Sequence, residues 1–392
     1  MISIDQAILA IKNTCKPLMK ETVKLVEKAS GYFLSQNVDS PISMPPFRQS
    51  AMDGYALNMH DHFEYHLVGE IKAGDNHQIT LKKGDAVRIF TGAPVPDSAN
   101  AVMMQENVKA NGDKIVIAHT ISEEHNIRAL GEQVKEGDVA LKKGTKLTPA
   151  AIGYLTSLGI TEVSVYKKPS IALVTTGNEL IKAGQPLSYG KIYESNSTML
   201  QNALNNLNFY DITLHKVADD YEKTKSKLQS VLNQNDLVIV TGGISVGDYD
   251  FVGKSLLELN TEEIFYKVKQ KPGKPLYFGK KEDTFIFALP GNPAAALSCF
   301  YAYVYIALQK MMNREALELP RIKAKSLSNF EKRGDRPQFL KAIHNNGKVE
   351  ILEGQNSSML QTFALSNALV FIPETVSNIS LNDEVDVILL PS

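Results

Sequence analysis

From Pro169 onward the sequence repeats one order, in which a short and largely apolar run is followed by a segment with helical spacing. The runs are IALVTT, ITLHKV, DLVIVT and TFIFAL, and helical patterns lie near residues 198–207 and 221–232. Continuous apolar runs are typical of strands buried on both faces, and helices between them allow the strands to run parallel. We therefore expect residues 169–317 to form a doubly wound α/β domain with helices on both faces of its sheet.

Two other regions have a β pattern. Residues 51–131 hold short alternating segments such as DAVRIFTG and KIVIAHT, broken by Gly, Asn and Asp. Residues 318–392 hold further short strands and an Asn-Gly turn. Such spacing predicts a β-rich domain in the first region and a small β-barrel or sandwich in the second.

Two helices are predicted before the α/β region. Ser3 and Gln6 form a capping box ahead of apolar residues at helical spacing. A second helix is expected to start at Thr148, with Pro149 at its first position, and to stop near Gly159. We expect residues 1–50 and 132–168 to form a discontinuous N-terminal domain around the β-rich insertion, which gives four domains in all.

Composition excludes several classes of protein. The 392 residues carry a formal net charge of −1, which argues against a nucleic-acid-binding protein with a broad basic face. Only two cysteines are present, too few for a disulfide scaffold or a thiolate zinc site. The N-terminus lacks signal-peptide order, and the most apolar run, residues 294–308, is shorter than the ~20 residues of a spanning helix. We expect a cytoplasmic protein without membrane partners.

Three polar or glycine-rich segments follow predicted strands of the α/β region. Because parallel strands end at one edge of a sheet, these segments are expected to share a cleft. Glycines allow close approach of a phosphate or a pterin, and carboxylates at such a loop suit magnesium. Taken singly, each segment could equally be a turn whose carboxylates cap the next helix. The candidate residues are Thr176, Gly177, Asn178 and Glu179 in the first segment, Gly242, Gly243, Ser245, Asp248 and Asp250 in the second, and Pro290 and Pro293 in the third.

A second group of candidates is cationic. Lys271 and Lys274 lie on the stiff turn Lys-Pro-Gly-Lys-Pro, which can bind a compact dianion or can simply be a solvated loop. Arg336 and Ser358 lie in turn-like segments of the last region. Each of these two segments alone is more typical of a turn than of a site.

The segment from Pro45 to Ala56, PPFRQSAMDGYA, is too apolar for a linker and too rich in turn formers for a regular element. It is expected to be a constrained loop that presents Asp53, although Phe47, Met52 and Tyr55 could instead make it a packing segment. Thr91 and Arg128 lie in similar ordered loops of the β-rich region.

Together these segments resemble the molybdopterin molybdenumtransferase family, the molybdenum insertases related to the insertase half of gephyrin-type proteins. The resemblance extends over essentially the whole chain. Its motifs occur in family order as PPFRQSAMDGYA, TGAPVP, NIRALGEQ, TTGNEL, KIYESN, TGGISVGDYDFV, KPGKP, LPGNP, RPQF and GQNSS. The resemblance implies a molybdopterin-binding α/β domain, an elongated β-rich domain that reaches across a homodimer, and a C-terminal β-barrel.

The family reaction implies the substrates and the cofactor. Molybdate is inserted into the dithiolene of adenylylated molybdopterin with Mg²⁺-dependent hydrolysis of the adenylate and release of AMP, the last step of molybdenum cofactor biosynthesis. The resemblance also implies an active site shared between the chains of a homodimer, and contacts with the molybdopterin adenylyltransferase and with molybdoenzyme acceptors.

Matched motifs assign roles to the candidate residues. The cradle for nucleotide and pterin would be Thr176, Gly177, Asn178, Glu179, Gly242, Gly243 and Ser245, with Glu194, Ser195 and Asn196 as a polar turn over the same pocket. Asp250 and Asp248 would be the magnesium-side carboxylates. Lys271, Lys274, Arg336 and Ser358 would face molybdate, with Pro290 and Pro293 shaping the wall. Asp53, Thr91 and Arg128 would come from the partner's β-rich domain, with Asp53 as a positioning group or a base for an attacking oxygen.

Three departures from the family pattern concern the molybdate contacts: Gln133 replaces a frequent carboxylate, Ala295 replaces a frequent serine, and Met359 replaces a frequent basic residue. Two alternative functions remain at this point. One is a non-catalytic pterin-binding or scaffold protein, which retention of the charged candidates disfavours. The other is the adenylyltransferase of the same pathway, which needs only the α/β domain.

Overall fold

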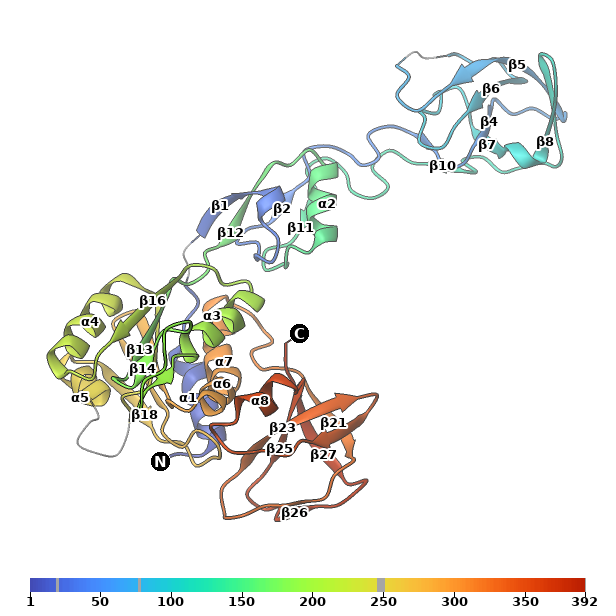
Figure 1. Ribbon diagram of the computed structural model, residues 1–392. Helices are drawn as coiled ribbons and strands as arrows, with labels where there is room; N and C mark the ends of the chain where they lie inside the picture. Colours follow the sequence, from blue (N-terminus) through green and yellow to red (C-terminus); the bar gives the residue numbers. More distant parts are fainter. Residues whose placement is uncertain (19–20, 77–78, 245–250, 392) are drawn as a thin grey trace. The chain divides into compact units, whose positions relative to one another are not determined.

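The structure is a computed structural model that describes residues 1–392 except 19–20, 77–78, 245–250 and 392. The chain divides into two compact units (Figure 1). Unit 1 comprises Met1–Lys20 and Tyr166–Ser392, and unit 2 comprises Glu21–Val165. Each unit has its own hydrophobic cores.

A six-stranded sheet forms the centre of unit 1. Its strands, in spatial order, are β16 (Ile212–Val217), β13 (Ile171–Thr176), β17 (Leu237–Thr241), β20 (Thr284–Leu289), β19 (Tyr277–Lys281) and β18 (Glu262–Tyr266). The first four run parallel, as the sequence predicts, whereas β19 and β18 pair antiparallel. Only Glu282 and Asp283 separate β19 from β20, and so short a connection can join only antiparallel neighbours.

Helices cover both faces of this sheet (Figure 1). They are α1 (Ile4–Thr14), α3 (Asn196–Asn206), α4 (Tyr221–Gln234), α5 (Phe251–Glu258), α6 (Pro293–Cys299), the π-helical segment Phe300–Val304 and α7 (Tyr305–Met311). Even-numbered residues of the central strands, such as Val174, Val240 and Ile286, share a core cluster with residues of α4 and α5. On the other face α3 contacts β13 and α6 contacts β20. Alternation along each strand therefore places buried side chains on both faces, and the predicted doubly wound domain is confirmed.

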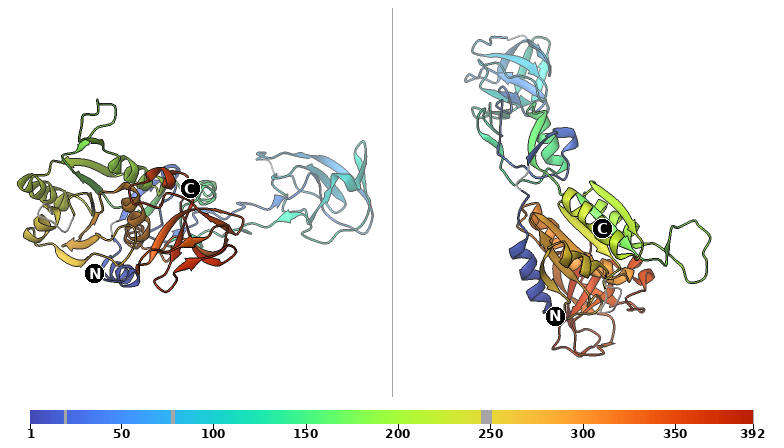
Figure 2. Two further views of the ribbon diagram at one scale, coloured as in Figure 1. Left: turned by 60° about the horizontal axis from the view of Figure 1, so that its bottom comes forward. Right: turned by 90° about the vertical axis from the view of Figure 1, so that its left-hand side faces the viewer.

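Short strands β14 (Leu180–Ile181) and β15 (Ile192–Tyr193) pair just beyond the end of β13. The intervening loop, residues 182–191, projects away from the sheet (Figure 2). In this loop Tyr189 is fully exposed and Leu187 is largely exposed.

The C-terminal part of unit 1 is a closed barrel, which confirms the barrel prediction. Its strands, in order around the barrel, are β21 (Arg321–Ser326), β24 (Lys348–Ile351), β23 (Gln338–Asn345), β25 (Ala368–Ile372) and β27 (Glu384–Leu389). The pair β22 (Phe330–Glu331) and β26 (Asn378–Ile379) and the helix α8 (Leu360–Ala364) complete it. Asn346 and Gly347 both have positive φ between β23 and β24, as a tight Asn-Gly hairpin requires.

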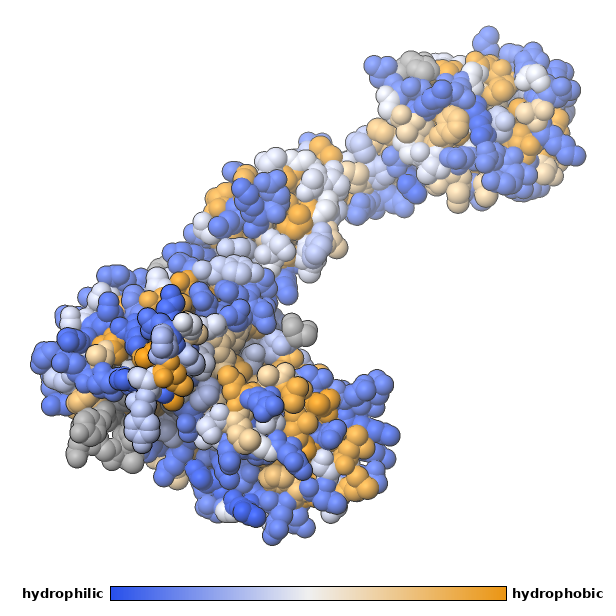
Figure 3. All heavy atoms as spheres, in the orientation of Figure 1, coloured by the Kyte–Doolittle hydropathy of each residue, from blue (hydrophilic) through white to orange (hydrophobic). Residues whose placement is uncertain are grey.

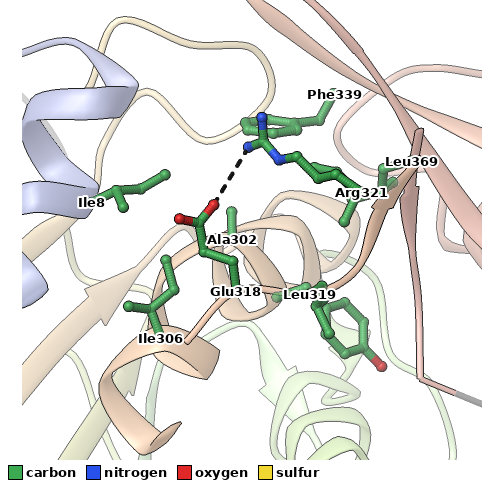
Figure 4. Close-up of a pocket in the computed structure, with 10 residues that line it drawn as sticks. Ile8, Ala302, Ile306, Glu318, Leu319, Arg321, Phe339 and Leu369 are labelled. Carbon is green, nitrogen blue, oxygen red and sulfur yellow. Dashed lines mark ion pairs between the residues drawn. The ribbon is translucent and has the colours of Figure 1, made fainter. Parts of the chain in front are cut away.

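Helix α1 packs within unit 1. Its capping box forms as predicted, since the Ser3 hydroxyl accepts from the Gln6 N–H and the Gln6 side chain accepts from the Ser3 N–H. Figure 4 shows Ile8 and Ile306 beside a small cavity of about 20 Å³, near the Glu318–Arg321 ion pair of 3.9 Å. Helix α1 therefore belongs to unit 1 with the α/β and barrel regions, and the division of the chain into four domains remains a prediction.

Unit 2 is mostly β. It contains β1 (Glu21–Leu25), β2 (Val38–Asp39), β3 (Gln49–Ser50), β4 (Gly54–Leu57), β5 (Glu64–Ile71), β6 (Asp85–Ile89), β7 (Ala101–Met104), β8 (Val108–Asn111), β9 (Lys114–Ile117), β10 (Ile127–Arg128), β11 (Val139–Leu141) and β12 (Glu162–Tyr166), with 3-10 turns at Val26–Lys28 and Gln105–Asn107. Six of these strands form one sheet in the order β7-β4-β6-β5-β9-β8. Its helix, α2 (Pro149–Ser157), starts at the predicted cap Thr148.

The surface is mainly hydrophilic on the face drawn in Figure 3, where apolar residues lie among polar ones. Among the described residues, no helix has both the length and the apolar character needed to cross a membrane.

Candidate active site

The three predicted strand-end loops of unit 1 meet, and glycines make their contact possible. Gly242 has φ +81°, and a Cβ there would lie 2.6 Å from the backbone oxygen of Thr176. A Cβ on Gly243 would lie 2.7 Å from the Thr176 hydroxyl oxygen, and one on Gly291 would lie 3.6 Å from the Gly242 Cα. Contacts below 3.0 Å are too short for a real Cβ, so the loops after β13 and β17 can touch only because glycine lacks one.

These loops enclose a cleft of about 590 Å³, a volume typical of small-molecule sites. Nine of the sequence-predicted residues line it: Thr176, Glu179, Glu194, Ser195, Asn196, Gly242, Pro290, Pro293 and Ser358. The remaining lining residues include Tyr193, Ile244, Pro275 and Asn292. The cleft therefore combines polar side chains with a few apolar ones at its wall.

Two polar atoms of the cleft are buried and lack a hydrogen-bond partner among the described residues: the Thr176 hydroxyl and the Oδ1 of Asn196. The amide nitrogen of Asn196 donates to the Gly291 oxygen at 2.8 Å, which fixes the orientation of its side chain. Leaving a buried polar group unpaired is costly, so such atoms are rare unless a ligand satisfies them. Both residues line the cleft, so a polar ligand there is one available partner for these two atoms.

The polar turn before α3 is ordered by its own side chains. Glu194 accepts from the Ser197 N–H at 2.8 Å, and its backbone N–H donates to Ile181 at 2.8 Å. Glu194 therefore caps the first turn of α3 and at the same time lines the cleft.

Asn178 is hydrogen-bonded to a neighbouring loop of unit 1. Its backbone N–H donates to an Asp219 carboxylate oxygen at 2.9 Å, and its side-chain oxygen accepts from the Asp219 N–H at 3.1 Å. Neither Asn178 nor Gly177 is a lining residue of the cleft. The pair Asn178–Asp219 instead ties the loop after β13 to the loop after β16.

Three predicted residues, Ser245, Asp248 and Asp250, lie outside the described residues. Elsewhere in the chain, as far as the structure describes it, no group of three or more His, Cys, Asp or Glu residues could hold a metal ion. The predicted magnesium site thus rests on Asp248 and Asp250, which are not among the described residues.

Lys271 and Lys274 are both exposed, and in the described part of the chain neither has an ion-pair partner. Their neighbour Lys269 differs, because it pairs with Asp335 at 3.3 Å and with Glu374 at 2.7 Å. The next residue of the turn, Pro275, lines the cleft, although the two lysines and Arg336 do not. The turn therefore offers two uncompensated cations next to the cleft wall.

Lys341 of β23 is a residue that sequence reasoning missed. It is only 3% exposed, and its ammonium group donates to the oxygens of Gly354, Asn356 and Met359 at 2.8, 3.1 and 3.2 Å. Burial lowers the pKa of this amine. By binding three carbonyls, Lys341 holds the loop that carries Ser358 to the cleft, and no motif in the sequence distinguishes it from other strand lysines.

The loop that carries Ser358 is also fixed from the side of α6. Asn292 donates to the Ser357 hydroxyl at 2.9 Å, and the Ala295 N–H donates to the Ser357 oxygen at 3.2 Å. Ala295, where relatives of the resembled family frequently have serine, is 1% exposed. It contacts the Ser357 loop through its backbone N–H and not through a side chain.

Unit 2 brings Asp53 and Thr91 together. One Asp53 carboxylate oxygen accepts from both the N–H and the hydroxyl of Thr91, each at 2.7 Å. These two hydrogen bonds, the backbone one first, lower the pKa of Asp53, with a further contribution from Arg88. Asp53 is therefore ionised and oriented although it is exposed.

Buried Ser50 connects the three predicted loops of unit 2. Its N–H donates to Ala93, its oxygen accepts from the Gly92 N–H, and its hydroxyl donates to Met52. Ser50 also pairs with Ile127, which places Arg128 opposite Gln49. The segments that carry Asp53, Thr91 and Arg128 thus lie side by side in unit 2.

Comparison with known families covers nearly all of the chain. Residues 2–159 match the family described as "MoeA N-terminal region (domain I and II)". Residues 172–310 match "Probable molybdopterin binding domain", and residues 323–390 match "MoeA C-terminal region (domain IV)".

Full-length relatives agree with these matches. A molybdopterin molybdenumtransferase of Haemophilus influenzae is 34% identical, over 99% of this chain and 98% of its own. One of Staphylococcus epidermidis is 30% identical, over 98% of this chain and 96% of its own. The crystal structure of the molybdopterin biosynthesis MoeA protein of Pyrococcus horikoshii superposes with a TM-score of 0.85 at 30% identity, covering 99% of this chain and all of that one. The chain therefore belongs to the molybdopterin molybdenumtransferase family.

Proposed function

We propose that this chain inserts molybdate into the dithiolene of adenylylated molybdopterin and releases AMP, with Mg²⁺ as the required divalent cation. Membership of the family makes it a transferase of molybdenum cofactor biosynthesis. The finer reaction is our proposal, and one observation carries it: among the described residues, the cleft of unit 1 holds two buried polar atoms without a partner, and its wall residue Pro275 adjoins a turn whose two lysines have no ion-pair partner.

The cleft is proposed to bind the nucleotide and the pterin. The Thr176 hydroxyl can donate to a ligand oxygen, and the Asn196 Oδ1 can accept from an amino or ring N–H. Gly242 and Gly243 keep the wall free of side chains, so that phosphate oxygens can approach the backbone. Glu179, Glu194 and Ser195 add polar groups around the same volume.

The cationic turn is proposed to receive molybdate. Molybdate is a tetrahedral dianion, which short rigid cations and a hydroxyl can hold without permanent coordination. Lys271, Lys274, Arg336 and Ser358 supply those groups. The support is that Lys271 and Lys274 carry no compensating carboxylate within the described residues, whereas Lys269 does.

Asp53 is proposed to orient the oxygen that attacks the adenylate, from the partner chain of a homodimer. Two donors from Thr91 lower its pKa, which makes it a weaker base and supports a positioning role over proton abstraction. Arg128 would supply a positive charge beside it. The active site would then be shared between two chains, each contributing unit 1 to one site and unit 2 to the other.

Asp250 and Asp248 are the proposed ligands of Mg²⁺, because carboxylate oxygens are the donors that this ion prefers. When bound, the ion would withdraw charge from the pyrophosphate. Further partners in this proposal are the molybdopterin adenylyltransferase and molybdoenzyme acceptors. The proposed location is the cytoplasm, where the buried free thiols of Cys15 and Cys299 would stay reduced.

The direct test incubates the protein with adenylylated molybdopterin, Mg²⁺ and molybdate and measures AMP. Release that depends on molybdate is expected. Binding without release would indicate a scaffold protein instead, and synthesis of the adenylate from ATP would indicate an adenylyltransferase.

A matched pair of variants tests the cleft. Thr176→Val removes the unpartnered hydroxyl at constant shape and should weaken binding of adenylylated molybdopterin by about five-fold, the equivalent of one hydrogen bond. Thr175→Val is the control, since Thr175 is equally buried on β13 but does not line the cleft. Calorimetric titration of both variants checks this, and equal affinities would contradict the assignment of the cleft.

A further inference from the structure

Hydrogen bonds of residues 270 and 271 join the turn that carries Lys271 and Lys274 to the segment that carries Arg336. The Lys271 N–H donates to Pro337 at 2.9 Å, and the Lys271 oxygen accepts from the Phe339 N–H at 2.9 Å. The Arg336 guanidinium donates to the Gln270 backbone oxygen at 3.1 Å. Backbone bonds therefore join the turn 271–274 to the barrel segment that carries Arg336.

The Gln270 side chain holds the inner side of this turn. Gln270 is 1% exposed, and its amide nitrogen donates to the Gly273 oxygen at 3.0 Å. A Cβ on Gly273, which has φ +83°, would lie 2.4 Å from the sulfur of Cys299. The turn is thus pressed against α6, and it cannot move inward.

Tyr303 fixes the other end of the same amide. Its hydroxyl donates to the Oε1 of Gln270, and Tyr303 is fully buried in the π-helical segment after α6. Burial holds the pKa of Tyr303 well above its usual range, so the hydroxyl keeps its proton in any ordinary buffer. Because the Gly273 oxygen can only accept, the amide nitrogen must face Gly273, and the amide oxygen then faces Tyr303.

No ligand reaches this pair directly, because both side chains are buried and neither lines the cleft. The Gln270 side chain instead holds the turn in which the exposed Lys271 and Lys274 flank Pro272 and Gly273. Active-site groups need such support, since small displacements of a charged group cost much of its interaction with the ligand.

We propose that Gln270 and Tyr303 are positioning residues for the anion-binding turn, and that they set the affinity for molybdate through the placement of Lys271 and Lys274. This inference rests on the proposed function only in the identity of the anion. It assigns a role to a buried tyrosine and a buried amide that bind neither substrate.

Tyr303→Phe tests the inference, because it removes the hydroxyl and leaves the ring. The KM for molybdate should rise about ten-fold, while kcat and the KM for adenylylated molybdopterin stay within about two-fold. Tyr301→Phe is the matched control on the same helix, since the described residues offer its hydroxyl no hydrogen-bond partner. It should leave all three parameters unchanged. A merely structural effect would change both KM values or kcat, and it would overturn the proposal.

Direct titration of molybdate into the full-length protein separates this inference from the proposed reaction. Weaker molybdate binding by Tyr303→Phe than by the parent protein supports the inference even if turnover is absent, whereas equal binding overturns it. An absence of molybdate binding in both proteins overturns it as well. If Tyr303→Phe fails to fold, Gln270→Met provides the same measurements, because it removes the amide at similar volume and should give the same selective loss.

Discussion

Asp53 is an exposed carboxylate whose position is set by its neighbour Thr91. The N–H and the hydroxyl of Thr91 both donate to the same oxygen, which leaves the second oxygen of Asp53 available to a ligand. Its lowered pKa follows first from the backbone donor and then from the hydroxyl. An oriented anion of this kind suits the positioning of a water or an oxyanion substrate better than it suits proton abstraction.

Thr91→Val should raise the pKa of Asp53 part of the way toward its ordinary value, because the hydroxyl is lost and the N–H remains. The folded-state pKa lies below the unfolded one, so the stabilisation by these bonds is present above the unfolded pKa and is lost as pH falls through the folded pKa. The variant should therefore lose stability relative to the parent at neutral pH, with a smaller difference in strong acid. Carboxyl NMR titration of Asp53 and urea midpoints at several pH values measure both effects.

The control for this prediction is the same substitution in an Asp53→Asn background. There the effect of Thr91→Val on stability should no longer depend on pH, because the titrating group is absent. An unchanged Asp53 pKa in the single variant would show that the hydroxyl does not donate.

At the scale of elements, the cleft depends on how closely two strand-end loops approach. The loop after β17 touches the loop after β13 at Gly242 and Gly243, and the loop after β20 contacts them through Gly291. Parallel strand order in the sheet places all three loops at one edge. At Gly242 and Gly243 a side chain would clash with the loop after β13, so glycine is required there. At Gly291 a Cβ would make only an ordinary contact, so glycine is not required.

Gly242→Ala and Gly291→Ala should therefore differ. At Gly242 the new Cβ meets the Thr176 backbone at 2.6 Å and the φ of +81° is strained, so the free energy of unfolding should fall by more than about 1 kcal/mol. At Gly291 the nearest atom is 3.6 Å away, an ordinary contact, and the change should be within about 0.5 kcal/mol. Denaturant unfolding of the two variants is the measurement. Equal losses would mean that the loops do not meet as described.

Sequence patterns predicted the elements that have strong local signals. The capping box at Ser3, the cap at Thr148, the four parallel strands and the Asn-Gly hairpin all depend on neighbouring residues and were all confirmed. The antiparallel edge of the sheet was missed, although only Glu282 and Asp283 separate its two strands.

Support for the site was less predictable, because it depends on contacts between distant segments. The Gln270 side chain is held by Tyr303, 33 positions along the chain, and Lys341 donates to carbonyls 13 to 18 positions away. A glutamine in a turn and a lysine in a strand have no local signature for such roles. The hydrogen bonds between Asn178 and Asp219 also join distant segments, and the motif that suggested a ligand contact for Asn178 gave no sign of them.

At the scale of the whole molecule, the candidate residues divide between two units. Unit 1 contains the cleft and the cationic turn, and unit 2 contains Asp53, Thr91 and Arg128. Each set is ordered by contacts within its own unit. The proposed function requires unit 1 of one chain and unit 2 of another to form one site together.

Mixing two inactive variants tests this central claim most directly. Asp53→Ala disables unit 2 and Lys274→Ala disables unit 1, so each variant alone should release almost no AMP in the molybdate-dependent assay. In a mixed dimer, Asp53 of one chain and Lys274 of the other complete one of the two sites. After random exchange of subunits, the equal mixture should recover about a quarter of the parent activity. A mixture that exchanges subunits, as differently tagged chains would reveal, and still releases no AMP would contradict the shared site, and a parent protein without molybdate-dependent release would contradict the proposed function itself.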